Sequence, residues 1–115
     1  MIETIILDYL NALPEHPAPA LSEVPEGGVT PPCWIVERTG GGGMEGCIGT
    51  ATLAIRSYGA TLYEAAALNE TLKAAMAGAA ALPEIARCRL NTDYNYTDTA
   101  KKQYRYQAVY DIIHY

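Results

Sequence analysis

The chain has 115 residues, long enough for one hydrophobic core and too short for two. Half of its residues are hydrophobic, Phe is absent and Tyr occurs nine times. The formal net charge of −5 argues against a surface that grips nucleic-acid phosphates, because such binding draws on clustered Lys and Arg. We expect one domain over residues 1–115, with tyrosines at positions that are half-buried or become buried on association.

The three cysteines, Cys33, Cys47 and Cys88, include no CxxC pair. This odd and scattered set predicts small buried thiols in a reducing compartment. The first 13 residues have no basic start that would mark a secretory signal, and no apolar run approaches the ~18 residues of a membrane span. We therefore expect a soluble intracellular protein.

The first predicted element is a short amphipathic helix that Pro14 ends. Its apolar residues recur at helical spacing: Ile2, Ile5, Ile6, Tyr9, Leu10 and Leu13. Residues 14–32 hold six prolines and predict a long loop. Such a loop in a compact domain is functional, ordered by a partner or a solvated connector, and the sequence leaves these readings open.

Two strands are predicted next. Residues 33–39 are rich in β-branched and aromatic side chains, and residues 47–58 place Cys47, Ala51, Leu53 and Ile55 on one face. The glycines at 40–43 separate the two runs. We expect an antiparallel hairpin with a glycine-rich tip.

A second helix is predicted to begin at Thr61, because Thr61-Leu-Tyr-Glu64 has the form of a capping box. In that motif the hydroxyl of Thr61 accepts from the amide of residue 64, and Glu64 reaches back to the amide of Thr61. Gly78 offers a stop. One apolar stripe follows the helix: Ala65, Leu68, Leu72, Ala75 and Met76.

The rest of the chain predicts two more strands. Residues 85–94 follow Pro83, residues 97–102 are polar and turn-like, and the final run begins at Tyr104. Its even positions are apolar or aromatic: Tyr104, Tyr106, Ala108, Tyr110 and Ile112. The predicted fold class is α+β, an antiparallel or mixed four-stranded sheet packed with two helices in the order α-β-β-α-β-β.

The sequence holds no recognisable motif for a cofactor or a metal. The glycine run is followed by Met44, Glu45 and Gly46 and then by a strand, whereas a phosphate-binding loop needs Lys-Ser or Lys-Thr and a helix. The cysteines lack zinc-finger spacing, and neither His16 nor His114 has an evident carboxylate nearby. We expect no cofactor, no metal and no catalytic residue.

The order of these features resembles the small tail-terminator, or tail-completion, proteins of long-tailed bacteriophages and their prophage relatives. The segments that carry the resemblance are PPCWIVERTGGGG, AIRSYGATLYEAAALNETL and YRYQAVYDIIHY, and together with the N-terminal helix they span nearly the whole chain. The landmarks are Tyr58, Gly59, Thr61, Glu64 and Ala65 at the strand-to-helix passage and Tyr104, Arg105 and Tyr106 in the closing strand.

The resemblance implies a structural protein of the virion rather than an enzyme. Members form a homo-hexameric ring that caps the tail tube, ends tail polymerisation and meets the head–tail connector proteins. DNA passes through such a ring without sequence recognition, and no membrane partner is implied. The implied location is the phage tail or neck, and the bacterial cytoplasm during assembly.

Two groups of interaction residues are expected. The hairpin tip, with Gly41, Gly42, Met44 and Glu45, is predicted to contact the tail tube or to line the ring opening. Contacts between ring subunits are assigned to charged residues within apolar strands: Glu37, Arg38, Arg56 and Arg105.

The sequence also leaves three other functions open. The chain could be a neck or head-closure protein of the same virion, which the sequence hardly separates from a tail terminator. It could be a non-enzymatic α+β domain with a small-molecule pocket. An enzyme that uses Cys47 or His114 is the third, and it predicts sensitivity to thiol alkylation or to loss of that histidine.

Overall fold

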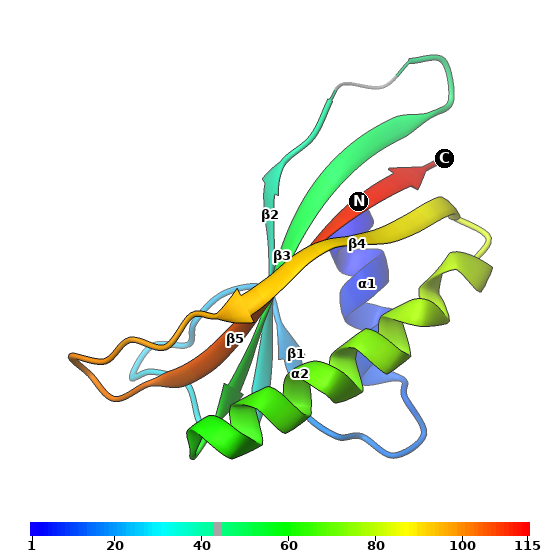
Figure 1. Cartoon of the computed structure of the whole chain (residues 1–115). Coiled ribbons are helices and arrows are strands. Elements are labelled where there is room, and N and C mark those ends of the chain that lie inside the picture. Colours follow the sequence, from blue (N-terminus) through cyan, green and yellow to red (C-terminus); the bar gives the residue numbers. More distant parts are fainter. Residues whose placement is uncertain (43–44) are drawn as a thin grey trace.

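Strands from both halves of the chain combine in a single mixed sheet within residues 1–42 and 45–115, which this computed structural model describes (Figure 1). The strand order is β1-β2-β3-β5-β4. The β1–β2 pair is parallel and every other neighbouring pair is antiparallel. The elements are α1 (Ile2–Asn11), β1 (Ala20–Leu21), β2 (Cys33–Gly40), β3 (Gly49–Gly59), α2 (Leu62–Ala77), the 3-10 helix η1 (Ala79–Ala81), β4 (Ile85–Asn95) and β5 (Tyr104–His114).

The predicted α+β class is confirmed, whereas the predicted count of four strands is wrong. The additional strand, β1, lies inside the segment predicted to be a loop and pairs with Trp34 and Ile35. Asn11 holds it in place, since its side-chain amide donates to the carbonyl of Ala20 (3.0 Å) and its Oδ1 accepts from the amide of Ala20 (2.9 Å). A two-residue strand shows no periodicity, so the sequence pattern could not reveal it.

The strand after the glycine-rich tip begins later than predicted. The backbones of Glu45 and Ile48 bond each other in both directions, which closes a tight turn before β3 starts at Gly49. Cys47 is therefore exposed and outside the strand, so its predicted place on the buried face is wrong. Cys33 is buried and Cys88 half-buried, and burial raises the pKa of both thiols, that of Cys88 to about 11.

Both helices cover the same face of the sheet (Figure 1). Leu68, Leu72 and Met76 of α2 are buried, as the predicted stripe requires, and they join Ile6 and Leu10 of α1 in one core. The sheet contributes alternate residues of its two central strands: Ala51, Leu53 and Ile55 from β3 and Ala108, Tyr110 and Ile112 from β5. The period-two pattern of both strands is confirmed on this face.

The passage from β3 to α2 is built around a close backbone approach. A Cβ atom added at Gly59 would lie 2.3 Å from the amide nitrogen of Ala65, so only glycine fits there. Thr61 caps the helix as predicted, with its hydroxyl accepting from the amide of Glu64 (3.1 Å). Glu64 departs from the prediction, because its carboxylate accepts from the amide of Ala60 rather than from that of Thr61 (3.1 Å).

Candidate interaction surface

The face of the sheet opposite the helices carries a cross-strand array of polar side chains, which we call the open face. Its rows follow from the register: Ile35 of β2 lies opposite Arg56 of β3, Arg56 opposite Gln107 of β5, and Gln107 opposite Tyr94 of β4. The charged members of the open face are Glu37, Arg56, Arg87, Arg89, Arg105 and Asp111. This face holds four of the five arginines of the chain.

One end of the open face is covered by the long loop that precedes β2. Cys33, Ile35 and Tyr58 are buried there as a second small cluster, and Leu21 and Val29 pack against it. The remaining rows carry no such cover among the described residues. The predicted loop is thus partly structural, because it covers the β2 and β3 side of this end of the face, where Cys33, Ile35 and Tyr58 lie.

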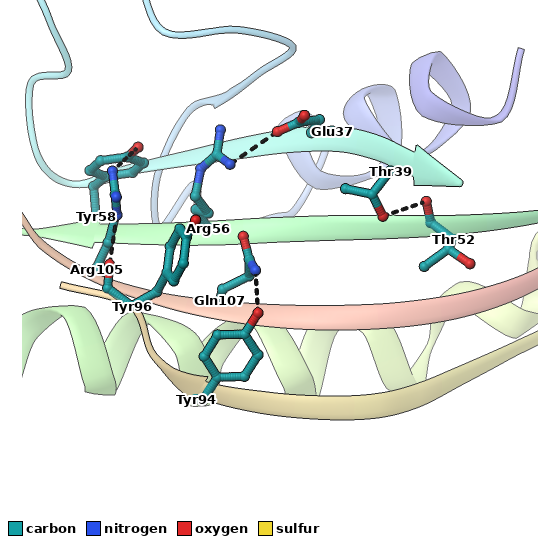
Figure 2. Close-up of polar contacts among 9 residues, drawn as sticks. All are labelled: Glu37, Thr39, Thr52, Arg56, Tyr58, Tyr94, Tyr96, Arg105 and Gln107. Carbon is teal, nitrogen blue, oxygen red and sulfur yellow. Dashed lines mark hydrogen bonds and ion pairs between the residues drawn. The ribbon is translucent and has the colours of Figure 1, made fainter. Parts of the chain in front are cut away.

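At the centre of this face, Arg56 and Glu37 form an ion pair across β2 and β3 (Figure 2). The distance from Nη1 of Arg56 to Oε2 of Glu37 is 3.0 Å. The Arg56 side chain is 17% exposed and that of Glu37 50%. The pair fixes the arginine, yet Nε of Arg56 is buried without a hydrogen-bond partner among the described residues. Arg56 therefore has a donor that the described part of the chain does not use.

Arg105 is held by two tyrosines at the covered end of the open face (Figure 2). Its Nε donates to the carbonyl oxygen of Tyr96 (2.7 Å), and Nη1 donates to the hydroxyl of Tyr58 (3.3 Å). The guanidinium also lies over both rings, 4.7 Å from the centroid of Tyr96 and 5.8 Å from that of Tyr58. Nearby, Gln107 Nε2 donates to the hydroxyl of Tyr94, and the rings of Tyr94 and Tyr96 pack edge to face.

A shallow hollow lies at the opposite end of this face, beside the edge strand β4. Arg87, Arg89, Asp111 and Ile113 line it, and its volume is about 140 Å³. Asp111 accepts from Asn91 (2.9 Å) and from Thr52 (3.3 Å). The sequence did not indicate Arg87 and Arg89 as interaction residues, because only the strand order brings them opposite Ile113 and Asp111.

The residues predicted for the hairpin tip do not adjoin the central ion pair. Gly42 donates its amide to the hydroxyl of Thr50 (2.8 Å), and Gly41, with a φ of 138°, lies so close to Thr50 that a Cβ there would come 2.5 Å from its carbonyl oxygen. Arg38 donates to the carbonyls of Gly40 and Thr50, so it braces the base of the tip. Glu45 is exposed, and the predicted contact at Met44 lies outside the described residues.

The predicted interaction residues therefore separate into distinct locations. Glu37 and Arg56 are paired on the open face, Arg105 lies at its covered end, and Arg38 belongs to the tip with Gly41, Gly42 and Glu45. Figure 1 shows this β2–β3 hairpin projecting away from the helices, with the β4–β5 hairpin projecting at the other end of the sheet.

A separate apolar groove lies between the end of α1 and the outer side of α2. Its walls include Leu13, Pro14, Pro17 and Ala75, with Glu15 at the rim, and its volume is about 300 Å³. Tyr9 crosses nearby and donates its hydroxyl to the carbonyl of Ala75 (2.6 Å). This groove lies on the helix side of the molecule, opposite the open face.

No protein-family model matches the chain, and no curated protein matches it significantly. Within residues 1–42 and 45–115, no group of three or more His, Cys, Asp or Glu is placed to hold a metal ion. In that same part of the chain no helix is both long enough and apolar enough to cross a membrane.

Proposed function

We propose that this chain is a structural subunit of a phage tail, a tail terminator that forms a six-membered ring on the end of the tail tube. The observation that carries the proposal is the two-sided build of the molecule, with helices on one face of the sheet and a polar, arginine-rich open face on the other. A closed ring needs heterologous contacts, in which one surface of a subunit meets a different surface of its neighbour.

The two hairpins support the same proposal. They lie at opposite ends of the sheet, since Gly49 pairs with His114 and Gly59 pairs with Tyr104 along the full length of β3 and β5. A ring subunit that joins a tube on one side and a connector on the other needs projections in both directions. We assign the β2–β3 tip to the tail tube.

A pull-down against the cognate tail-tube protein and, separately, against the connector proteins tests this function. The wild-type chain should capture the tube protein, and a variant that lacks residues 41–44 should fold normally yet lose that capture. Capture of the connector alone would favour a neck or head-closure protein. If the deletion variant captures the tube protein as well as the wild-type chain does, the tip does not contact the tube.

The matched control is Lys101→Glu with Lys102→Glu in the turn of the other hairpin, where both side chains are exposed. This variant should keep tube capture if the β2–β3 tip is the contact. Thermal unfolding of each variant separates loss of binding from loss of fold.

A further inference from the structure

Charge is divided between the two sides of this acidic molecule. The open face holds four arginines against the carboxylates of Glu37 and Asp111, although the chain as a whole has a net charge of −5. The helix side carries exposed acids instead, including Asp8 on α1 and Glu15 in the turn that follows. The two sides therefore have complementary charge.

Arg87 and Arg89 differ from Arg56 and Arg105 in having neither an ion pair nor a side-chain hydrogen bond within residues 1–42 and 45–115. Among the described residues the ion pairs are Arg56 with Glu37 and Lys73 with Glu70 and Asp93. Arg105 is held by Tyr58 and Tyr96. Both Arg87 and Arg89 are exposed, and the hollow beside them is below the ~300 Å³ of a typical small-molecule site. Its size suits the head of one side chain.

We propose that the open face of one copy docks onto the helix side of a second copy, where Arg87 and Arg89 receive the carboxylates of Asp8 and Glu15. The inference deepens the proposed function and rests on it for the identity of the partner. Bidentate guanidinium–carboxylate pairs favour arginine over lysine at such a contact.

Apolar surface on both sides extends the same contact along the sheet. Tyr94 and Tyr96 are 41% and 42% exposed on the open face, and the groove next to Glu15 is lined by Leu13, Pro14, Pro17 and Ala75. Half-exposed tyrosines and an apolar groove are typical of the core of a protein interface, and ion pairs are typical of its rim.

Docking through the open face fits β4 better than the addition of a partner's strand to its outer edge. Its register shifts between Ile85 and Arg87 and again between Leu90 and Thr92, so its outer edge is interrupted by two irregularities. Bulges and charged side chains are devices that discourage edge-to-edge pairing. A contact through the face of the sheet uses Arg87 and Arg89 without a regular edge.

Nucleic acid fits the open face less well than a second copy of the chain does. Glu37 already pairs with Arg56, and Asp111 lies in the hollow with Arg87 and Arg89. Both carboxylates would face the phosphates, and the remaining surface of this acidic chain would repel them at low salt.

A reciprocal charge exchange tests the inference through the solution mass of the intact chain by light scattering. One variant carries Arg87→Glu and Arg89→Glu, and the other carries Asp8→Lys and Glu15→Lys. Wild type should associate at low salt and dissociate as salt rises, because rim ion pairs are screened. Each variant alone should associate more weakly, by roughly tenfold or more.

An equimolar mixture of the two variants should restore association. Each acidic open face then meets a basic helix side, and each basic open face meets an acidic helix side, so the copies alternate and masses exceed that of a dimer. The control is Lys101→Glu with Lys102→Glu, which changes the net charge equally, away from the open face, and should associate like wild type.

Three results would overturn the inference. A mixture that stops at a heterodimer would mean that open faces meet each other. Wild type that stays monomeric at low salt and high concentration would exclude docking between free copies, while capture of the tube protein would still decide the proposed function separately. Binding of a labelled single-stranded oligonucleotide that is lost on Arg87→Glu and Arg89→Glu would assign these arginines to phosphates.

Discussion

The two faces of this sheet are made by the same strands and yet follow different rules. On the helix side, buried apolar residues such as Leu53 and Ile55 pack under α1 and α2. On the open face, their sequence neighbours carry polar groups arranged across strands, as in the Arg56–Glu37 pair. One face of the sheet therefore stabilises the fold, while the other is available for recognition.

The test with the largest expected effect truncates one residue on each face of β3. Ile55→Ala should lower the free energy of unfolding by about 3 kcal/mol, because it removes fully buried methyl and methylene groups and leaves a cavity. Thr52→Ala, a polar truncation on the open face, should cost about 0.5 kcal/mol. Urea denaturation measures both, and equal losses would contradict the division between the faces.

The next test concerns the close approach that places α2 on the sheet. Gly59→Ala should destabilise the protein by about 2 kcal/mol, because the new Cβ would overlap the backbone of Ala65 and backbone cannot yield as a side chain does. Gly40→Ala is the matched control, since a Cβ there meets nothing within 4 Å. Thermal unfolding that shifts equally for both variants would contradict this account.

A pH titration examines the polar link between α2 and the edge strand. Asp93 accepts from Asn69 (2.8 Å) and pairs with Lys73 (3.0 Å), and these bonds, the one from Lys73 foremost, lower the pKa of Asp93 from 3.8. A lowered pKa in the folded state means that the stabilisation is present above pH 3.8 and is lost as pH falls through the folded-state value.

Asp93→Asn removes this titration and is the variant to compare. The difference in unfolding free energy between wild type and Asp93→Asn should be constant from pH 5 to 7 and should shrink below roughly pH 4. The pKa of Lys73 is raised by the same pair, so its contribution holds below pH 10.5 and does not interfere at acid pH. A difference that grows towards low pH would contradict the assigned link.

The smallest expected effect belongs to the ion pair on the open face. A double-mutant cycle with Arg56→Met and Glu37→Gln should give a coupling of about 0.5 kcal/mol, because Glu37 is half-exposed and solvent screens the pair. A coupling above about 2 kcal/mol would place this pair among buried, stability-determining contacts and blur the distinction between the faces.

The same contrast explains what the sequence could predict. The period of two in β3 and β5 and the stripe on α2 are local patterns, so the helix-covered face follows from them. The hollow by Arg87 and Arg89 depends on β5 lying between β3 and β4, which no local pattern encodes. The short strand β1 was missed because two residues show no periodicity and the side chain of Asn11 supplies bonds to it. Cys47 was misplaced because the turn closed by Glu45 and Ile48 delays β3.

The most direct measurement is electron microscopy of tail tubes assembled from the cognate tube protein with and without this chain. Tubes grown with the chain should stop at a defined length and carry a six-fold ring on one end. Tubes of unchanged length with bare ends would contradict the proposed function.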